Sequence, residues 1–187
     1  MDLYARIHIL EGRAVRLPKG DVRKAIALDA SPVSRARSWI SKGANHLHVV
    51  DLDAAAYLDY QNRELIRQII EEVDVPVQVA GGIRSTPEVE RMLDDLGAWR
   101  IVMGTAAIED QVLIWELCRK YPGRIAVALD VHANEEIATR GWQVNSGRYL
   151  EEVLIELSSA GAAGFVVSEA RRDALKEPAN LGVLRHA

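Results

Sequence analysis

Short runs of apolar residues recur along the chain, and most are followed by a segment in which apolar residues repeat at helical spacing. A continuous apolar run bounded by turn residues is typical of a buried strand, and a repeat every three or four residues is typical of a helix with one buried face. The runs predict strands at residues 3–10, 46–50, 75–79, 100–103, 125–129 and 164–167, with a further extended piece at 12–17. The repeats predict helices at residues 31–41, 62–72, 110–120 and 150–159, and one that begins at residue 85.

The alternation of strands and helices predicts a mainly parallel sheet, because parallel neighbours are joined by crossover helices. We expect about six such units in one domain, residues 1–187. Closed eight-stranded barrels and open doubly wound sheets both place their active sites at the carboxyl ends of the strands. The candidate residues at these ends are His8, Asp51, Gly81, Gly104, Asp130 and Ser168.

Two neighbouring predicted strands end in glycine-containing turns that open a helical pattern. Gly81 and Gly82 follow one strand, and Gly104 and Thr105 follow the next. Exposed backbone N–H groups in such turns, together with a helix N-terminus, can hold a phosphate group. The sequence therefore predicts a phosphate site at these turns.

The composition of the chain limits which ligands we expect it to bind and in which compartment we expect it. Of the 187 residues, 49% are hydrophobic and 27% are charged, which is typical of a globular domain, and the net charge of -4 gives no basic footprint for nucleic acid. Cys118 is the only cysteine, so we expect a small buried residue and no internal disulfide. The chain shows no apolar run of about 20 residues and no signal pattern at its start, which predicts a cytoplasmic protein without a membrane partner.

Several runs together resemble the phosphoribosylformimino-aminoimidazole-carboxamide ribotide isomerases of histidine biosynthesis. The similarity extends from Leu3 to about Asn180. The runs that carry it are GRAVRLPKGD at 12–21, LHVVDLDAA at 47–55, VPVQVAGGIRS at 75–85, VMGTAA at 102–107, VALDV at 127–131 and RGWQVNSG at 140–147.

The resemblance implies an α/β fold of the (β/α)8 TIM-barrel type, built from two half-barrels, and a ribose substrate with a phosphate at each end. The implied reaction is an Amadori aldose–ketose rearrangement that uses neither a cofactor nor a metal. One group must protonate the ring oxygen and another must take a proton from C2. The resemblance makes Asp130 the general acid and assigns one phosphate to the turns at Gly81-Gly82 and Gly104-Thr105.

The chain departs from the family pattern at three places. His8 occupies the position of the aspartate that acts as the base, and imidazole can also serve as a base near neutral pH. Ser168 replaces a threonine, and Asp173-Ala174-Leu175 replaces an Asp-Gly-Thr turn at the second phosphate, where Ala174 lacks the conformational freedom of glycine. The chain also ends within the expected sixth helix, so we expect an incomplete barrel. Either a longer protein has been shortened, or a second copy or another chain covers the open edges, or the fold is an open partial barrel.

Four further residues each have a functional and a structural interpretation. Asp51 is either a substrate-side carboxylate or a cap of the following segment, and Arg84 either assists a phosphate or is only solvated. Arg140 could bind an anthranilate carboxylate, as in the related bifunctional isomerases, or lie on a polar loop. Trp142 could stack on the imidazole of the substrate or be an exposed aromatic residue.

These observations leave three functional hypotheses. The first is a sugar-phosphate isomerase with Asp130 as acid and His8 as a substituted base. The second is a catalytically silent homologue that binds a phosphosugar or serves in assembly. The third is a bifunctional isomerase that also acts on phosphoribosyl-anthranilate. No spacing of histidines predicts a metal site, so we interpret His46, His48 and His132 as ordinary histidines.

Overall fold

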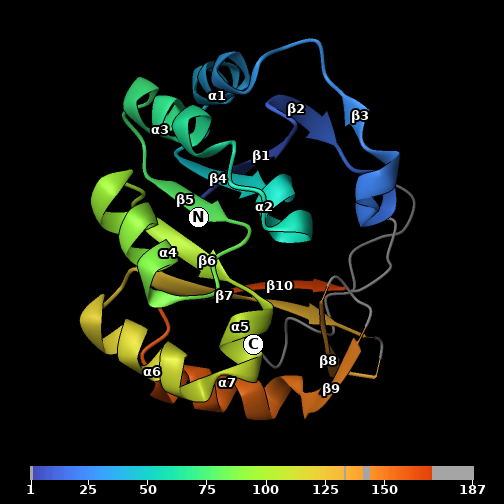
Figure 1. Cartoon of the computed structure of the whole chain (residues 1–187), viewed down its shortest axis with the longest axis vertical. Coiled ribbons are helices and arrows are strands. Elements are labelled where there is room, and N and C mark those ends of the chain that lie inside the picture. The colour runs from blue at the N-terminus through green and yellow to red at the C-terminus, as the bar shows by residue number, and fades with distance from the viewer. Residues whose placement is uncertain (1, 133, 141–143, 170–187) are drawn as a thin grey trace. The chain divides into compact units, whose positions relative to one another are not determined.

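The computed structural model describes residues 2–132, 134–140 and 144–169, and it divides into two compact units, Met1–Val102 and Met103–Ala187 (Figure 1). The single domain expected over residues 1–187 stays a prediction, because compactness does not measure whether either unit folds alone.

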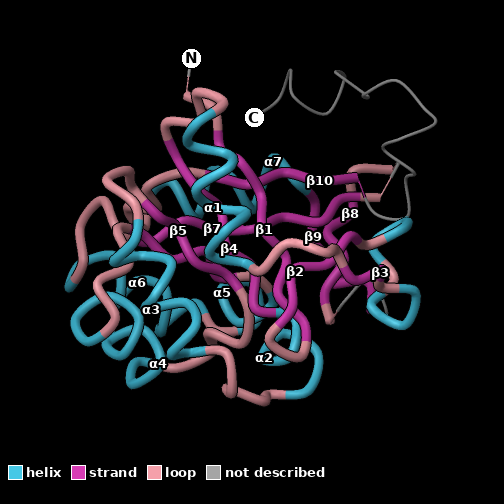
Figure 2. The backbone as a smooth tube through the Cα atoms, turned by 90° about the horizontal axis from the view of Figure 1, so that it is seen from above, coloured by secondary structure: helices cyan, strands magenta, loops and turns pink. Residues whose placement is uncertain are grey.

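The first unit is built on a sheet in the order β3-β2-β1-β4-β5-β6. Strands β1, β4, β5 and β6 are parallel, whereas β2 and β3 add to the edge of β1 in antiparallel fashion, so that β1 lies between β2 and β4 (Figure 2). The strands are β1 Tyr4–Leu10, β2 Arg13–Arg16, β3 Ile26–Ala27, β4 His46–Asp51, β5 Val77–Ala80 and β6 Arg100–Met103. The helical elements are η1 Pro18–Gly20, η2 Val22–Lys24, α1 Pro32–Ser41, α2 Leu52–Tyr57, α3 Arg63–Glu72, α4 Thr86–Glu90 and η3 Arg91–Asp95.

The second unit centres on β7, Ile125–Val131. Strand β10, Phe165–Glu169, pairs with β7 in parallel. Strand β8, Glu136–Thr139, pairs in antiparallel fashion with β7 and with β9, Val144–Tyr149. Its helices are α5 Thr105–Glu109, α6 Gln111–Lys120 and α7 Leu150–Ser159.

Local sequence signals explain where the longer helices begin. Ser31 caps α1 by accepting a hydrogen bond from the Ser34 N–H, with proline at the first positions, and Asp110 caps α6 by accepting from Leu113. In α3 the buried Ile66 and Ile69 share one face and pack toward the core. Helices α1 and α3 lie side by side in Figure 1.

The predicted α/β fold is confirmed: among the described residues the first unit has four parallel strands, β1, β4, β5 and β6, and the second has the parallel pair β7 and β10. Cys118 is buried, as its solitary occurrence predicted, and burial raises the pKa of its thiol. Several elements were not predicted, because they are short or lack an apolar pattern. They are β3, α2, α5, the hairpin of β8 and β9, and two 3-10 turns at Pro18–Gly20 and Val22–Lys24.

Candidate active site

Asp130 and Ser168 lie opposite each other at the ends of β7 and β10. The register of this parallel pair aligns Ser168 with Asp130, and the Ser168 hydroxyl donates a hydrogen bond to Asp130 Oδ1. Paired residues of parallel strands project to the same face of the sheet, so the contact follows directly from the strand register. The arrangement gives the carboxylate a fixed orientation and one hydroxyl donor.

His8 projects from β1 on the less buried face of that strand. Its neighbours Ile7 and Ile9 are fully buried on the opposite face, whereas His8 is half-buried. Burial, and then the nearby charge of Arg6, lower the pKa of His8 to about 4. His8 is therefore a neutral imidazole at pH 7, able to accept a proton but with an affinity close to that of a carboxylate.

A chain of hydrogen bonds crosses the same unit at His48, Gln78 and Arg100. The Arg100 guanidinium donates from Nε and Nη2 to Gln78 Oε1 over 3.0 and 2.7 Å, and from Nη2 to the Tyr4 hydroxyl over 3.0 Å. Gln78 Nε2 lies 2.8 Å from His48 Nδ1. Burial, followed by the charges of Arg6, His8 and Arg100, lowers the pKa of His48 to about 3, so this imidazole is also neutral at pH 7.

Asp51 caps α2 and is completely buried. Its Oδ1 accepts from the Ala54 N–H over 3.1 Å and from Asn62 Nδ2 over 2.9 Å, while Oδ2 is buried without a partner among the described residues. Burial raises the pKa of this carboxyl. Asn62 also donates to Asp53, which accepts the Glu11 N–H and so ties the turn after β1 to α2. Asp51 is therefore the N-cap of α2, and its role toward a substrate stays a prediction.

The two glycine turns have different structural requirements. Gly81 has a φ of +110°, and a Cβ at this position would lie 2.1 Å from the Asp51 carbonyl oxygen. Gly82 has a φ of +69°, and its Cβ would lie 2.6 Å from the Ala54 Cβ. At Gly104 a Cβ would meet nothing within 4 Å. Close packing against the end of β4 requires glycine at Gly81, and close packing against α2 requires it at Gly82, independently of any ligand. The backbone at Gly104 has open space beside it.

The predicted arginines make contacts on the surface of their own units. Arg140 pairs with Glu109 of α5 over 3.0 Å, and its backbone N–H donates to Thr105 Oγ1 over 2.9 Å. Arg84 donates to the Ala55 carbonyl over 3.2 Å. Trp142 and Asp173 lie outside the described residues.

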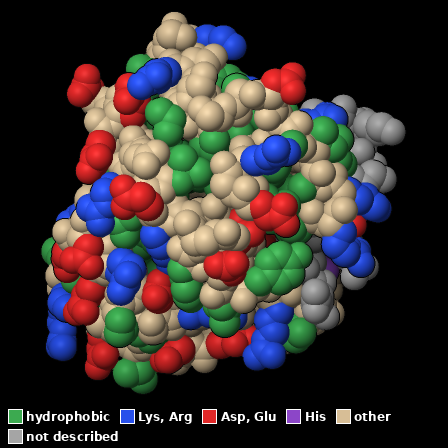
Figure 3. Space-filling view, turned by 45° about the horizontal axis from the view of Figure 1, so that its top comes forward, with side chains coloured by type: hydrophobic (Ala, Val, Ile, Leu, Met, Phe, Trp, Pro, Cys, Tyr) green, Lys and Arg blue, Asp and Glu red, His purple; other side chains and the backbone are tan. Residues whose placement is uncertain are grey.

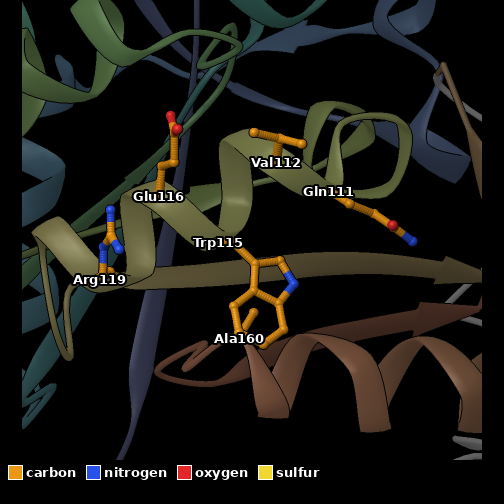
Figure 4. A pocket seen from close by; sticks show the side chains of 6 residues that line it. All are labelled: Gln111, Val112, Trp115, Glu116, Arg119 and Ala160. Atoms are coloured by element: carbon orange, nitrogen blue, oxygen red, sulfur yellow. The ribbon is translucent and has the colours of Figure 1, made fainter.

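A pocket of about 690 Å³ lies on the outer face of α6 and is lined by none of the predicted site residues. The Trp115 ring lies beside Ala160, at the end of α7, and Val112 and Glu116 project from α6 nearby (Figure 4).

Lys and Arg side chains are interspersed with Asp and Glu on the face shown in Figure 3. Within the described part of the chain, no cluster of three His, Cys, Asp or Glu side chains could hold a metal ion, and no helix is long and apolar enough to cross a membrane.

Comparison with known proteins assigns the family. A family model described as "Histidine biosynthesis protein" matches residues 2–187. The chain belongs to this family. Histidine biosynthesis proteins of this family have the TIM-barrel fold, in agreement with the parallel strands and crossover helices described above.

Curated relatives within the histidine biosynthesis family carry one enzyme name. Proteins from Cyanothece sp., Picosynechococcus sp. and Synechocystis sp. are 40%, 38% and 38% identical to this chain over 185 residues. Each alignment covers 99% of this chain and 71–72% of the relative. All three are named 1-(5-phosphoribosyl)-5-((5-phosphoribosylamino)methylideneamino)imidazole-4-carboxamide isomerase.

Sequence reasoning missed the contacts of His48 in this member of the family. The sequence indicated an ordinary histidine, whereas the structure joins it to Gln78 and Arg100. The available signal was a polar residue on each of three successive strands, each flanked by apolar residues. Only the strand register shows that these three residues are neighbours.

Proposed function

We propose that this protein is an isomerase of histidine biosynthesis that catalyses the Amadori rearrangement of a phosphoribosyl imidazole carboxamide. The observation that carries the proposal is the Ser168 hydroxyl bonded to Asp130 at the ends of paired parallel strands. The enzyme name of the curated relatives supplies the substrate class.

The reaction requires two proton transfers at the aminoribose. Asp130, when protonated, gives its proton to the ring oxygen, the C1–O bond breaks, and the nitrogen lone pair forms an iminium ion at C1. A base then removes the C2 proton, and the electron pair of that bond moves to form the enolamine. Ketonisation, in which the enol hydroxyl loses its proton and C1 gains one, gives the aminoketose, so the sum of the steps is an isomerisation.

His8 is the proposed base, and we expect its surroundings to slow the removal of the C2 proton. As a neutral imidazole it can take the C2 proton, but it then becomes a cation close to Arg6 and His48. A carboxylate at this position would instead become neutral and would attract the iminium ion before reaction. We therefore expect turnover, but slower turnover than an aspartate would support.

Backbone N–H groups are the proposed ligands for the substrate phosphates. From the family resemblance we assign the turns at Gly81-Gly82 and Gly104-Thr105, with Arg84 after the first of them, to one phosphate, and the turn at Asp173 to the second phosphate. Trp142 is proposed to stack on the imidazole of the substrate. Arg140 is a further substrate-side candidate, and its ion pair with Glu109 must open before its guanidinium can reach a ligand.

An isomerase assay on three proteins tests this function. The wild-type chain is expected to show weak turnover, His8→Asp to raise it by about tenfold or more, and Asp130→Asn to abolish it, since a positioned acid or base contributes roughly 10²–10⁴-fold. Circular dichroism of the three proteins controls for folding. Undetectable turnover in folded wild-type and His8→Asp proteins would contradict the isomerase assignment and favour the silent phosphosugar-binding homologue.

A further inference from the structure

Four polar side chains form one row across the parallel strands of the first unit. Arg6 on β1 pairs in register with His48 on β4, His48 with Gln78 on β5, and Gln78 with Arg100 on β6. Residues paired in this way in a parallel sheet project to the same face. His8 lies on the same face two residues further along β1, about 7 Å toward the carboxyl end.

The hydrogen bonds of this row have only one possible direction. An arginine can only donate, so Gln78 Oε1 must be the acceptor of the two bonds from Arg100. The Gln78 amide nitrogen is then the atom that faces His48, and it donates to Nδ1. Because Nδ1 accepts and the ring is neutral, the imidazole proton of His48 is on Nε2.

The row therefore offers hydrogen-bond donors and lacks free acceptors. His48 Nε2 has no partner among the described residues, and it is not one of their buried unpaired atoms, so solvent can reach it. Arg6 is exposed, and within the same residues its guanidinium has no hydrogen bond or ion pair. The carbonyl oxygen of Gln78 is already occupied by Arg100. The other titratable groups close to His48 are His8 and Arg100, and Tyr4 adjoins Arg100.

We propose that this row binds an oxyanion between the Arg6 guanidinium and the His48 Nε2–H. Phosphate, sulfate and carboxylate groups share the required chemistry, because each presents several acceptor oxygens and a negative charge to two adjacent donors. The row itself contributes no carboxylate that would repel such a group. The site is built from strand side chains and is separate from the glycine turns assigned above to substrate phosphate. It does not depend on the isomerase activity.

Gln78 and Arg100 are positioning residues for this site, because they determine which nitrogen of His48 carries the proton. Replacing Gln78 with glutamate would supply only acceptors, so His48 Nδ1 would have to carry a proton. The negative charge of the glutamate would also oppose the anion. The substitution Gln78→Glu would thus change both the tautomer of His48 and the affinity of the site for an anion.

The test uses the full chain with ¹⁵N-labelled histidine and sulfate as the probe, followed by NMR. At pH 7 the wild-type spectrum is expected to show His48 as the Nε2–H tautomer, with a saturable shift of that signal as sulfate is added. Arg6→Gln should weaken sulfate binding by about tenfold, as expected for the loss of one charge-assisted hydrogen bond. Arg91→Gln, which removes an exposed arginine from η3, is the matched control and should leave binding within about twofold.

Three outcomes would overturn the proposal: a His48 that carries its proton on Nδ1, no saturable shift with sulfate, or equal weakening by Arg6→Gln and Arg91→Gln. The wild-type tautomer is read without any substitution, so misfolding of a Gln78→Glu variant would not remove the test. Because the readout is an imidazole resonance and not turnover, failure of this site and failure of the isomerase assignment are distinguishable.

Discussion

The Ser168 hydroxyl donates to the Asp130 carboxylate across the paired strands β10 and β7. Removing this donor in Ser168→Ala leaves the carboxylate without its hydroxyl partner, and hydrogen bonds to charged groups contribute about 1.5–3 kcal/mol. We expect kcat/KM for the phosphoribosyl substrate to fall by about 10- to 100-fold. Ser168→Thr keeps the hydroxyl and should retain most of the activity, so an equal loss in both variants would argue against a role for the hydrogen bond.

Gly81 lies so close to Asp51 that even a methyl group cannot be accommodated. In Gly81→Ala the new Cβ would approach the Asp51 carbonyl oxygen to 2.1 Å at a φ of +110°. Backbone strain and overpacking together predict a loss of about 3 kcal/mol or more in the free energy of unfolding, measured with urea.

Gly97→Ala is the matched control for this substitution. Gly97 also has a positive φ, +78°, but the nearest atom to its Cβ would be Ile70 Cγ2 at 3.9 Å. This variant should lose only the strain of the left-handed conformation, about 1–2 kcal/mol. Equal losses in the two variants would show that the contact with Asp51 is unimportant.

The histidines of β1 and β4 predict a loss of stability in mild acid. Both have a pKa of 6.5 in the unfolded chain, and burial with neighbouring charges lowers these values to about 4 for His8 and about 3 for His48. Between pH 6.5 and 4 the unfolded chain binds more protons, so the free energy of unfolding falls as the pH decreases. Each histidine contributes a slope of about 1.4 kcal/mol per pH unit in this window.

Urea unfolding of the wild type and of His48→Gln across that window measures this slope. In the variant, the slope of the free energy of unfolding against pH should be smaller by the contribution of one bound proton. Asp51 acts in the opposite direction, because burial raises the pKa of its carboxyl and stability falls as the pH rises through that value. The comparison of the two proteins removes this contribution, and identical slopes would contradict the assignment to His48.

The stability of the protein is expected to depend strongly on the ion pair between Arg63 and Glu88. Arg63 Nη2 lies 2.6 Å from Glu88 Oε2, their side chains are only 11% and 21% exposed, and Arg63 Nε is buried without a partner among the described residues. Glu88→Ala should lower the free energy of unfolding by about 3 kcal/mol, because it leaves a buried charge unpaired. The double variant Arg63→Met with Glu88→Leu should recover most of this loss in urea unfolding. A double variant as unstable as Glu88→Ala would exclude this explanation.

The apolar pattern was sufficient for the parallel strands and for the four longest helices, but not for the shorter elements between them. Residues 125–129 are a continuous apolar run and residues 46–50 hold three apolar residues, and β7 and β4 occupy these ranges. Helix α2 spans only Leu52–Tyr57, too short to be stable alone, and it depends on the Asp51 cap and on burial of Leu52 and Ala54. Strand β9 is mostly exposed and polar, so it carries no alternating signal.

For the candidate site, too, the sequence identified individual residues but not the contacts between residues on different elements. The resemblance pointed to Asp130 and Ser168, and their contact followed once β7 and β10 were paired. The cap that Asp51 forms on Ala54 is local, whereas the second donor to this carboxylate, Asn62, lies beyond a loop and could not be known from spacing. The neighbours of His48 required the register of three strands, which a sequence pattern does not fix.

The packing of the turn after β5 also bears on the thermodynamics of ligand binding. Gly81 rests against the Asp51 backbone, and the Gly82 carbonyl accepts a hydrogen bond from the Tyr60 hydroxyl over 3.2 Å. The conformational entropy of this turn is therefore lost when the unit folds and not when a ligand arrives. A phosphate that binds there would meet a preorganised backbone, and its affinity would not be reduced by the cost of ordering a loop.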